Sequence, residues 1–286
     1  MRMNFSPVAA ARFVRHGGNF SVHRLALERL GEGIHPIMGF DHFVMGGPTF
    51  APHPHAGFSA VTYVFEDSRG GMRNRDSMGH DIAVLPGELV WTQAGRGVIH
   101  DEAPATPGAP VHGLQLFVNL SARNKDLAPE VFHVAKAKIP TLTDARGNRT
   151  RIVAGSYGPI ASPMKSAEPF DFFDVHVRGE WTWQVPAGRS VLVYVLDGKL
   201  KVVGSDGQEQ PLEDHEAVGI RENGGVGEAL RLQAGAGAHV LVLSGVDPQE
   251  PIAVYGPFIM NSESELARAY ERYQSGQMGR LTQAAA

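Results

Sequence analysis

Two short motifs contain side chains that can bind a metal ion. His53-Pro54-His55 places two histidines two positions apart, and His100-Asp101-Glu102 places a histidine and a glutamate at the same spacing. In a β-strand, side chains at i and i+2 point to the same face, so each motif can aim two ligands inward. Three imidazoles and one carboxylate suit a first-row divalent metal such as iron, nickel, manganese, copper or zinc. If the two strands are neighbours, the sequence predicts one metal site inside a β-barrel.

The segments beside the two motifs favour β-strands. Val61 to Phe65 follows the first motif and Leu85 to Trp91 precedes the second, and both contain residues typical of strands. Pro54 lacks a backbone N–H, so we expect its segment at a strand end, an edge or a bulge. Thirty-four glycines and nineteen prolines indicate many short strands joined by tight turns. The sequence therefore predicts an all-β fold class.

Charge and composition exclude several classes of function. The formal net charge of −4 gives no positive excess for neutralising phosphates, so we expect no non-specific nucleic-acid binding. The absence of cysteine excludes disulfides, thiolate metal sites and cysteine nucleophiles. Residues 1–7 lack an apolar signal core, and apolar runs such as Val191 to Leu196 are too short to cross a bilayer. We expect a cytoplasmic protein that does not insert into membranes.

The chain divides into two lobes. Strands and turns alternate from about Phe20 to Leu120, and a polar connection follows. We place the boundary near residue 135, so that residues 1–135 form an N-terminal metal-binding lobe. Residues 136–286 then form a second lobe and a C-terminal helix.

The second lobe repeats the strand pattern of the first without its ligands. The apolar run around Tyr194 resembles the run around Tyr63. Matching these tyrosines places Gln184 and Pro186 at the positions of the first histidine motif. We therefore expect the second lobe to lack a metal site and the chain to bind one metal ion.

The C-terminal segment has the pattern of a helix. Ser262 and Glu265 form a Ser-x-x-Glu capping box in front of an amphipathic stretch, which ends near Ser275-Gly276. We expect this helix to cover part of its own lobe; a helix that binds a partner is the alternative.

Seven segments match one family pattern in the same order along almost the whole chain. They are His53-Pro54-His55-Ala56-Gly57-Phe58, Val61-Thr62-Tyr63-Val64, Arg75-Asp76-Ser77-Met78-Gly79, Pro86-Gly87-Glu88, Ala94-Gly95-Arg96-Gly97-Val98-Ile99-His100-Asp101-Glu102, Gly113-Leu114-Gln115-Leu116-Phe117-Val118-Asn119-Leu120 and Gly256-Pro257-Phe258-Ile259-Met260-Asn261. Together they resemble the pirins, which are bicupins. The resemblance implies two cupin-type jelly-roll β-barrels in tandem.

The resemblance also implies a ligand set. Pirins bind iron through two histidines of the first motif and a histidine and a glutamate of the second, which carry over to His53, His55, His100 and Glu102. Fe(2+) is the implied cofactor, with Ni, Mn, Cu, Co or Zn as alternatives. Four protein ligands leave two positions of a six-coordinate iron open for a substrate and O₂.

Two classes of function follow from the resemblance. Some bacterial pirins oxidise quercetin with release of carbon monoxide, and this chain resembles their metal motif. That reading implies a dioxygenase for a flavonol, in which Glu102 is both a ligand and the catalytic proton acceptor. Other pirins are regarded as metal-dependent regulators that bind a transcription factor or a metabolic enzyme. A cupin with a purely structural metal is a third alternative.

Several further residues are candidates for a substrate pocket. Phe40, His42, Phe58 and Gln115 could line such a pocket, although aromatic residues on strands also form ordinary barrel core. Gln115 could also hydrogen-bond a ligand imidazole, but the opposite face of its strand is the more apolar one. Which of the two faces points inward therefore stays open. We expect His112, His176, His215 and His239 to be structural or exposed rather than ligands.

One position departs from the family pattern. Ser59 follows Phe58, where pirins usually have a glutamate. If the strand continues without a bulge, Ser59 shares the face of His53 and His55 and leaves the pocket less acidic. A bulge at Pro54 would turn Ser59 outward and leave the change without effect.

Overall fold

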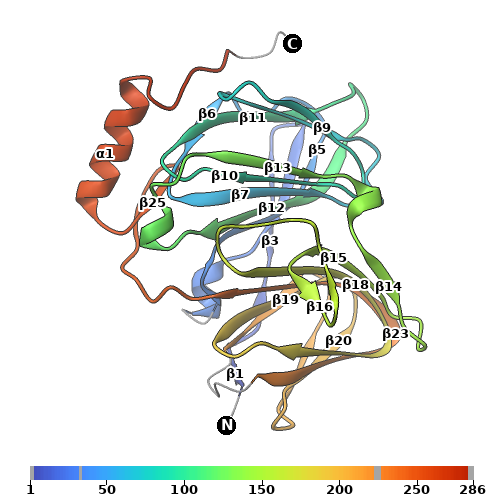
Figure 1. Cartoon of the computed structure of the whole chain (residues 1–286). Helices are drawn as coiled ribbons and strands as arrows, with labels where there is room; N and C mark the ends of the chain where they lie inside the picture. Colours follow the sequence, from blue (N-terminus) through green and yellow to red (C-terminus); the bar gives the residue numbers. More distant parts are fainter. Residues whose placement is uncertain (1–2, 32–33, 222–226, 283–286) are drawn as a thin grey trace. The chain divides into compact units, whose positions relative to one another are not determined.

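Strands dominate the computed structural model, which describes residues 3–31, 34–221 and 227–282 (Figure 1). The all-β prediction is confirmed, and one α-helix, α1 (Glu263–Gln274), occurs in the described residues. The predicted cap is present, because Ser262 accepts a hydrogen bond from the Glu265 backbone N–H. No helix in these ranges has the length and hydropathy needed to cross a membrane.

The chain forms two compact units with exchanged end segments. The first lobe comprises Phe13–Arg24, Ile37–Lys136 and Pro248–Ala286. The second lobe comprises Met1–Arg12, Leu25–Pro36 and Ala137–Asp247.

This division corrects the expected contiguous lobes, although the chain does pass from one unit to the other between Lys136 and Ala137. Pairing and packing explain the exchange. The N-terminal strands β1 (Asn4–Phe5) and β2 (Ala9–Ala10) pair with β22 (Glu216–Arg221) and cover that sheet edge. The C-terminal strand β25 (Phe258–Met260) and α1 pack in one apolar cluster with Ala56 of the first lobe.

The first lobe contains two main sheets. The seven-stranded sheet has the order β13 (Glu130–Val134), β10 (Leu89–Gln93), β7 (Phe58–Val64), β12 (Val111–Asn119), β5 (Ile37–Met45), β4 (Phe20–Arg24) and β3 (Arg12–His16). The four-stranded sheet has the order β6 (His53–His55), β11 (Val98–Pro104), β8 (Met72–Asp76) and β9 (Asp81–Val84). A hairpin of β24 (Ala253–Tyr255) with β25 precedes α1. Apolar side chains from both sheets share one core cluster, so the sheets enclose a common interior.

The second lobe is built on one large sheet. Its order is β1, β22, β19 (Arg189–Gly198), β23 (Glu228–Val246), β18 (Phe170–Val185), β15 (Arg149–Ala154) and β14 (Thr141–Thr143), with β2, β20 (Leu200–Val203) and β21 (Glu209–Leu212) beside this path. A small hairpin of β16 (Ser156–Tyr157) with β17 (Ile160–Ala161) is added. Valine, leucine and tryptophan side chains from these strands form its core, in which Phe173, Val175 and Val177 mark the inward face of β18.

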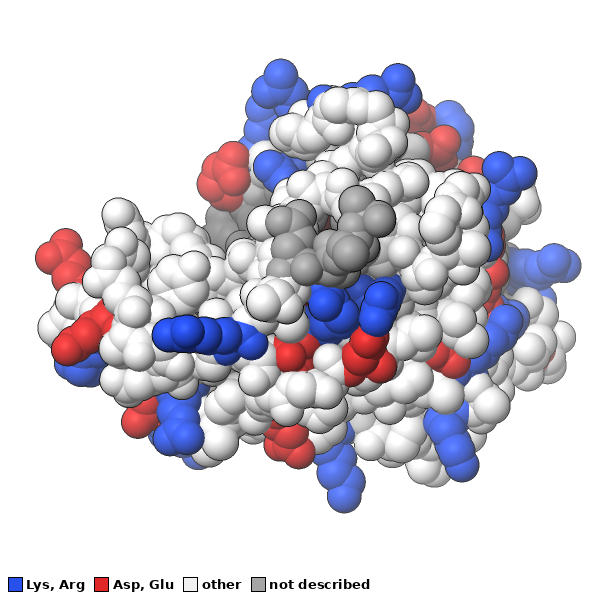
Figure 2. Space-filling view, turned by 90° about the horizontal axis from the view of Figure 1, so that it is seen from above, with Lys and Arg blue, Asp and Glu red and all other residues white. Residues whose placement is uncertain are grey.

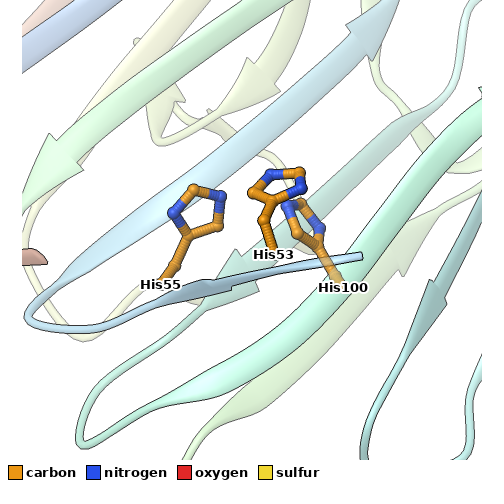
Figure 3. A group of neighbouring side chains, drawn as sticks. All are labelled: His53, His55 and His100. Carbon is orange, nitrogen blue, oxygen red and sulfur yellow. The ribbon is translucent and has the colours of Figure 1, made fainter. Parts of the chain in front are cut away.

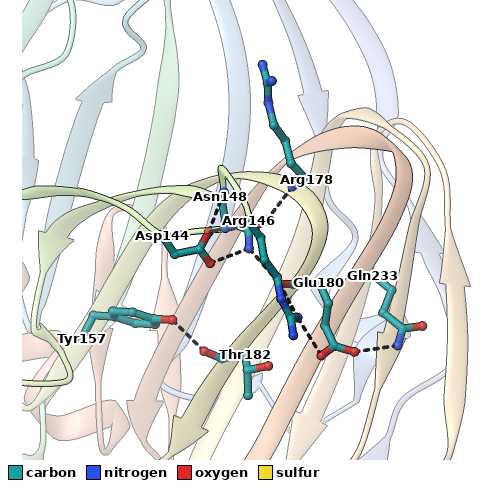
Figure 4. Close-up of polar contacts among 8 residues, drawn as sticks. All are labelled: Asp144, Arg146, Asn148, Tyr157, Arg178, Glu180, Thr182 and Gln233. Carbon is teal, nitrogen blue, oxygen red and sulfur yellow. Dashed lines mark hydrogen bonds and ion pairs between the residues drawn. The ribbon is translucent and has the colours of Figure 1, made fainter.

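Polar contacts fix the β14–β15 hairpin of the second lobe (Figure 4). Asp144 accepts hydrogen bonds from the backbone N–H groups of Arg146 and Asn148, which closes the turn. The Asn148 side-chain amide then donates to the Glu180 carbonyl, and Arg146 pairs with the Glu180 carboxylate. An open pocket of about 730 Å³ borders this network. Several charged groups at its rim are already paired, including Lys199 with Glu213.

Charged side chains of both signs occur on the face of the molecule that Figure 2 shows. Figure 2 shows Lys and Arg interspersed with Asp and Glu on one face of the molecule, rather than gathered in a single basic region.

The core of the second lobe yields a first test. Leu232 is fully buried in the β23 part of this core, so Leu232→Ala should lower the free energy of unfolding by about 2–5 kcal/mol. Val246 lies at the end of the same strand and is 43% exposed, and Val246→Ala should change stability by less than about 0.5 kcal/mol. Denaturant titration measures both, and equal effects of the two changes would contradict the assigned core.

Candidate metal centre

Three histidines converge in the first lobe. Antiparallel pairing of β6 with β11 places His53 opposite His100 and His55 opposite Val98. One ring nitrogen from each of the three histidines lies within 4.8 Å of the others. The ring centroids are 4.8 Å apart in every pair, and the rings are steeply inclined to one another. Figure 3 shows the three rings on the same side of the two strands.

Hydrogen bonds orient two of these rings. Nδ1 of His53 lies 2.9 Å from the Ala51 carbonyl oxygen, which can only accept, so Nδ1 carries the proton and Nε2 is left with a lone pair. Nδ1 of His100 lies 3.2 Å from Oδ1 of Asn74, which turns Nε2 of His100 in the same way. Hydrogen-bond partners of this kind, on the ring nitrogen that faces away from the metal, are typical of metal-binding imidazoles, and we call them outer partners.

The buried imidazoles are held in the neutral form. Burial, with a smaller contribution from the charge of His53, lowers the pKa of His55 to about 3. Burial and the neighbouring His55 and His53 likewise lower the pKa of His100 well below its usual range. Nε2 of His100 is buried without a hydrogen-bond partner. Neutral rings and an unpartnered buried nitrogen fit a bound divalent metal.

Glu102 lies beside this cluster but outside it. It follows His100 by two residues on β11, is 8% exposed, and accepts a hydrogen bond from Oγ1 of Thr62. Its carboxylate is not among the ligand atoms grouped within 4.8 Å. Burial raises the pKa of Glu102 to about 7, the Thr62 hydrogen bond opposes this, and the charge of Asp101 adds to it. The intervening Asp101 binds Arg75 in a bidentate ion pair instead.

Thr62 connects Glu102 to Gln115. Oγ1 of Thr62 contacts Oε1 of Glu102 and also lies 2.9 Å from the Gln115 side-chain amide. A hydroxyl has one hydrogen, so Thr62 can donate to only one of them at a time. When Glu102 is ionised, Thr62 donates to it, and the Gln115 amide can turn over so that its NH₂ donates to Thr62. When Glu102 is protonated, it can donate to Thr62, and Thr62 donates to Oε1 of Gln115. The network therefore accommodates either protonation state of Glu102.

The same contacts settle which face of β12 points inward. Gln115 pairs with Thr62, and both lie on the face that meets Glu102. On this face Phe58 and Phe117 contact each other, with ring centroids 4.9 Å apart, and both contact the ring of His55. The structure thus brings Phe58 and Gln115 to the candidate centre.

Phe40 and His42 are not brought there. Phe40 pairs with Leu116 and His42 pairs with Leu114, whereas Gln115 pairs with Asp41. Paired residues share a face, so both candidates lie on the opposite side of the sheet. His42 is instead hydrogen-bonded to His112 there, with 2.7 Å between the Nε2 atoms. The prediction that they line the pocket is wrong.

The expectation for Ser59 is also corrected. Gly57, with φ of +85°, turns the chain between β6 and β7, which belong to different sheets. The strand therefore does not continue from His55. Ser59 is buried and pairs with Val118, on the face opposite Thr62.

A buried lysine fastens this turn. Nζ of Lys125 donates to the Gly57 carbonyl (2.7 Å), to Oδ1 of Asn119 (2.5 Å) and to the Ile259 carbonyl (2.9 Å). A Cβ on Gly57 would lie 1.9 Å from the Ile259 oxygen, so no other residue fits the approach of β25. Sequence reasoning did not select Lys125, Thr62 or Asn74. Thr62 could have been noticed, because it is the one hydroxyl-bearing aliphatic residue in the otherwise apolar segment Val61-Thr62-Tyr63-Val64.

The second lobe lacks corresponding ligands at the expected positions. Gln184 and Pro186 are exposed, and the apolar core cluster of this lobe does not include them. That the chain binds one metal ion inside the first barrel and none inside the second stays a prediction.

Comparisons with known proteins agree with this geometry. The family model described as "Pirin" matches residues 18–118, and "Pirin C-terminal cupin domain" matches residues 172–279. A Pseudomonas aeruginosa protein that is provisionally named quercetin 2,3-dioxygenase is 36% identical over 247 residues, which cover 82% of this chain and 81% of the relative. Mouse pirin is 30% identical and the match covers 87% of this chain and 84% of that protein.

Solved structures show the same fold. Quercetin 2,3-dioxygenase from Acinetobacter baumannii superposes with a TM-score of 0.82 and 27% identity, over 98% of this chain and 99% of that one. An Escherichia coli pirin, YhhW, solved in complex with nickel(II), superposes with a TM-score of 0.65 and 17% identity, over 86% of this chain and 99% of that one. The second likeness shows the fold alone.

Removal of one histidine tests the metal centre. His100→Ala should weaken metal binding by more than the roughly 10- to 100-fold typical of outer partners, because it removes a ligand. The exposed His16 on β3 provides the control, and His16→Ala should bind metal normally. Elemental analysis and calorimetric titration measure both, and full occupancy in His100→Ala would refute the assignment.

Removal of the buried ammonium tests the support of the turn. Lys125→Met leaves two buried carbonyl oxygens and one amide oxygen without this donor, so stability should fall by at least about 2 kcal/mol. Metal affinity should fall by roughly tenfold, the low end for outer partners. Lys136→Met, at an exposed ion pair, should leave both quantities unchanged. Wild-type metal affinity in folded Lys125→Met would show that the lysine only supports the fold.

Proposed function

Because the chain belongs to the pirin family, we propose that it is a metal-dependent dioxygenase that acts on quercetin or a similar flavonol. The observation that carries this proposal is the convergence of three buried or half-buried imidazoles next to a buried carboxylate. His53, His55, His100 and Glu102 would hold the metal, and we propose Fe(2+), with Ni, Mn, Cu, Co or Zn as alternatives. A bound iron supplies Lewis acidity toward a phenol or enol and electrons for O₂.

Glu102 is the residue we assign to proton transfer. Its carboxylate is buried beside the histidines and hydrogen-bonded to Thr62, where it can accept a proton in one step and release it in another. Oε1 of Glu102 accepts the hydrogen bond from Thr62, so Oε2 can take the proton of a substrate hydroxyl while this bond is kept.

Aromatic side chains suit a planar substrate. Phe58 and Phe117 pack against His55 and give the interior an apolar wall on the side of the histidines. A flavonol ring could stack on such a wall, which would exclude water from the reacting oxygens. Gln115 offers an amide that could hydrogen-bond a polar group of the substrate.

An oxygen-uptake assay tests the proposal. The protein, loaded with Fe(2+) without oxygen, should consume O₂ when quercetin is added. Glu102→Gln should lower turnover by roughly 100- to 10,000-fold, and its metal content should fall much less than its turnover. The reason is that an amide oxygen can bind a metal but cannot accept a proton. Glu130 is exposed on β13, and Glu130→Gln should behave as wild type.

The opposite outcome would favour the other class of function. If the iron-, nickel-, manganese- and copper-loaded proteins all fail to consume O₂ with quercetin, the dioxygenase proposal is refuted. A metal-dependent regulator that binds a protein partner would then account for the metal centre.

A further inference from the structure

The second lobe contains its own group of metal-binding side chains. Asp174 and His176 lie two residues apart on β18 and therefore share a face, and His239 on β23 stands directly opposite His176. Phe173, Val175 and Val177 of the same strand point into the apolar core. The three polar side chains thus lie on the other face of the sheet, outside the barrel interior.

Their positions relative to one another approach those of a ligand set. One ligand atom from each of Asp174, His176 and His239 lies within 4.8 Å of the other two. Nε2 of His239 is 2.6 Å from Oδ1 of Asp174, and the rings of His176 and His239 stack with centroids 3.9 Å apart. Asp174 is 2% exposed, whereas both histidines are half-buried and can be reached from solvent.

We propose that Asp174, His176 and His239 form a second site for a divalent first-row metal such as Zn²⁺ or Ni²⁺. Two imidazoles and one carboxylate are a common ligand set for these ions, with water completing the coordination. Ligand atoms around a tetrahedral Zn²⁺ are roughly 3.3 Å apart for bonds of about 2 Å. The more distant atoms must therefore approach by at most about 1.5 Å, whereas Nε2 of His239 and Oδ1 of Asp174, 2.6 Å apart, must separate by about 0.7 Å. Rotation of the two histidine rings can provide both changes. The metal replaces the proton shared by Asp174 and His239.

The surroundings make this site weaker than the one in the first lobe. The rings of His176 and His239 are nearly parallel, at 17°, and have to turn before both can face one ion. On the adjacent strand β15, Arg149 stands opposite His176 and Arg151 stands opposite Asp174 in the strand register. This register brings two positively charged residues to the same face of the sheet. In the first lobe the rings are already inclined at 65–90°. We expect the second site to bind its metal ion at least roughly tenfold more weakly than the site in the first lobe, the low end of the effect of losing residues that orient metal ligands.

His176 and His239, which were expected to be structural or exposed, thus become ligands, and the chain binds two metal ions rather than the expected one. The lack of a metal site inside the second barrel is unaffected, because the new site lies on the opposite face of its sheet. Metal binding at the second site does not depend on any dioxygenase activity of the first lobe.

Titration of the metal-free full-length protein with Zn²⁺ tests it. The wild type should bind two ions, and the double variant His53→Ala with His100→Ala should keep one, which belongs to the second site. Adding His176→Ala to that double variant should abolish the remaining site. His176 is the most informative ligand to remove, because its loss leaves the buried Asp174–His239 hydrogen bond intact.

Two further measurements distinguish loss of metal binding from loss of folding in the variants. Zn²⁺ should raise the unfolding temperature of the double variant but not that of the triple variant, which separates binding from misfolding. Co²⁺ should give ligand-field absorption in the double variant that His176→Ala removes, while a His16→Ala control keeps it. Binding of a single ion by the wild type, or equal residual binding by the double and triple variants, would overturn the proposal.

Discussion

The antiparallel pairing of β6 with β11 is the constraint on which the candidate centre depends. It sets His53 against His100 and lets His55 reach the same point from the end of its strand. A shift of this register by one residue would turn the β11 ligands to the opposite face, because side chains alternate along a strand. Burial lowers the pKa values of His55 and His100 and keeps these two rings neutral. Hydrogen bonds to the Ala51 carbonyl and to Asn74 determine which nitrogens of His53 and His100 face inward.

The pairing is held in place by residues from distant parts of the chain. Lys125 joins Gly57, Asn119 and Ile259, so the turn after His55, the end of β12 and the C-terminal β25 share one ammonium group. Met278 and Ile99 belong to the same apolar cluster as Ala56, so the C-terminal segment also packs next to His100. The ligands are therefore positioned by a shell that extends well beyond the two strands that carry them.

The strand-rich fold, the cap of α1 and the i, i+2 spacing within each ligand motif could be predicted from the sequence, because each depends on local spacing. The four-residue ligand set stays a prediction. The sequence did not show which face of β5, β7 or β12 points inward. Both faces of these strands are largely buried, so the alternation of apolar and polar residues gave no direction for Phe40 and His42 on β5 or for Ser59 on β7. The turn at Gly57 resets the alternation. His176 and His239 met only through cross-strand register, which single-sequence reasoning does not provide.

The exchange of end segments has a consequence for synthesis of the protein. The histidines emerge from the ribosome early, but Phe258 and Ile259, which close the turn at Gly57, emerge on the order of ten seconds later. During this interval the nascent first lobe lacks its C-terminal strand and helix, and the Lys125 ammonium lacks one of its acceptors. Metal capture in the cell is thus expected to follow synthesis of the β25 segment rather than emergence of the histidines. A gene fragment that stops at the polar connection would never reach that stage.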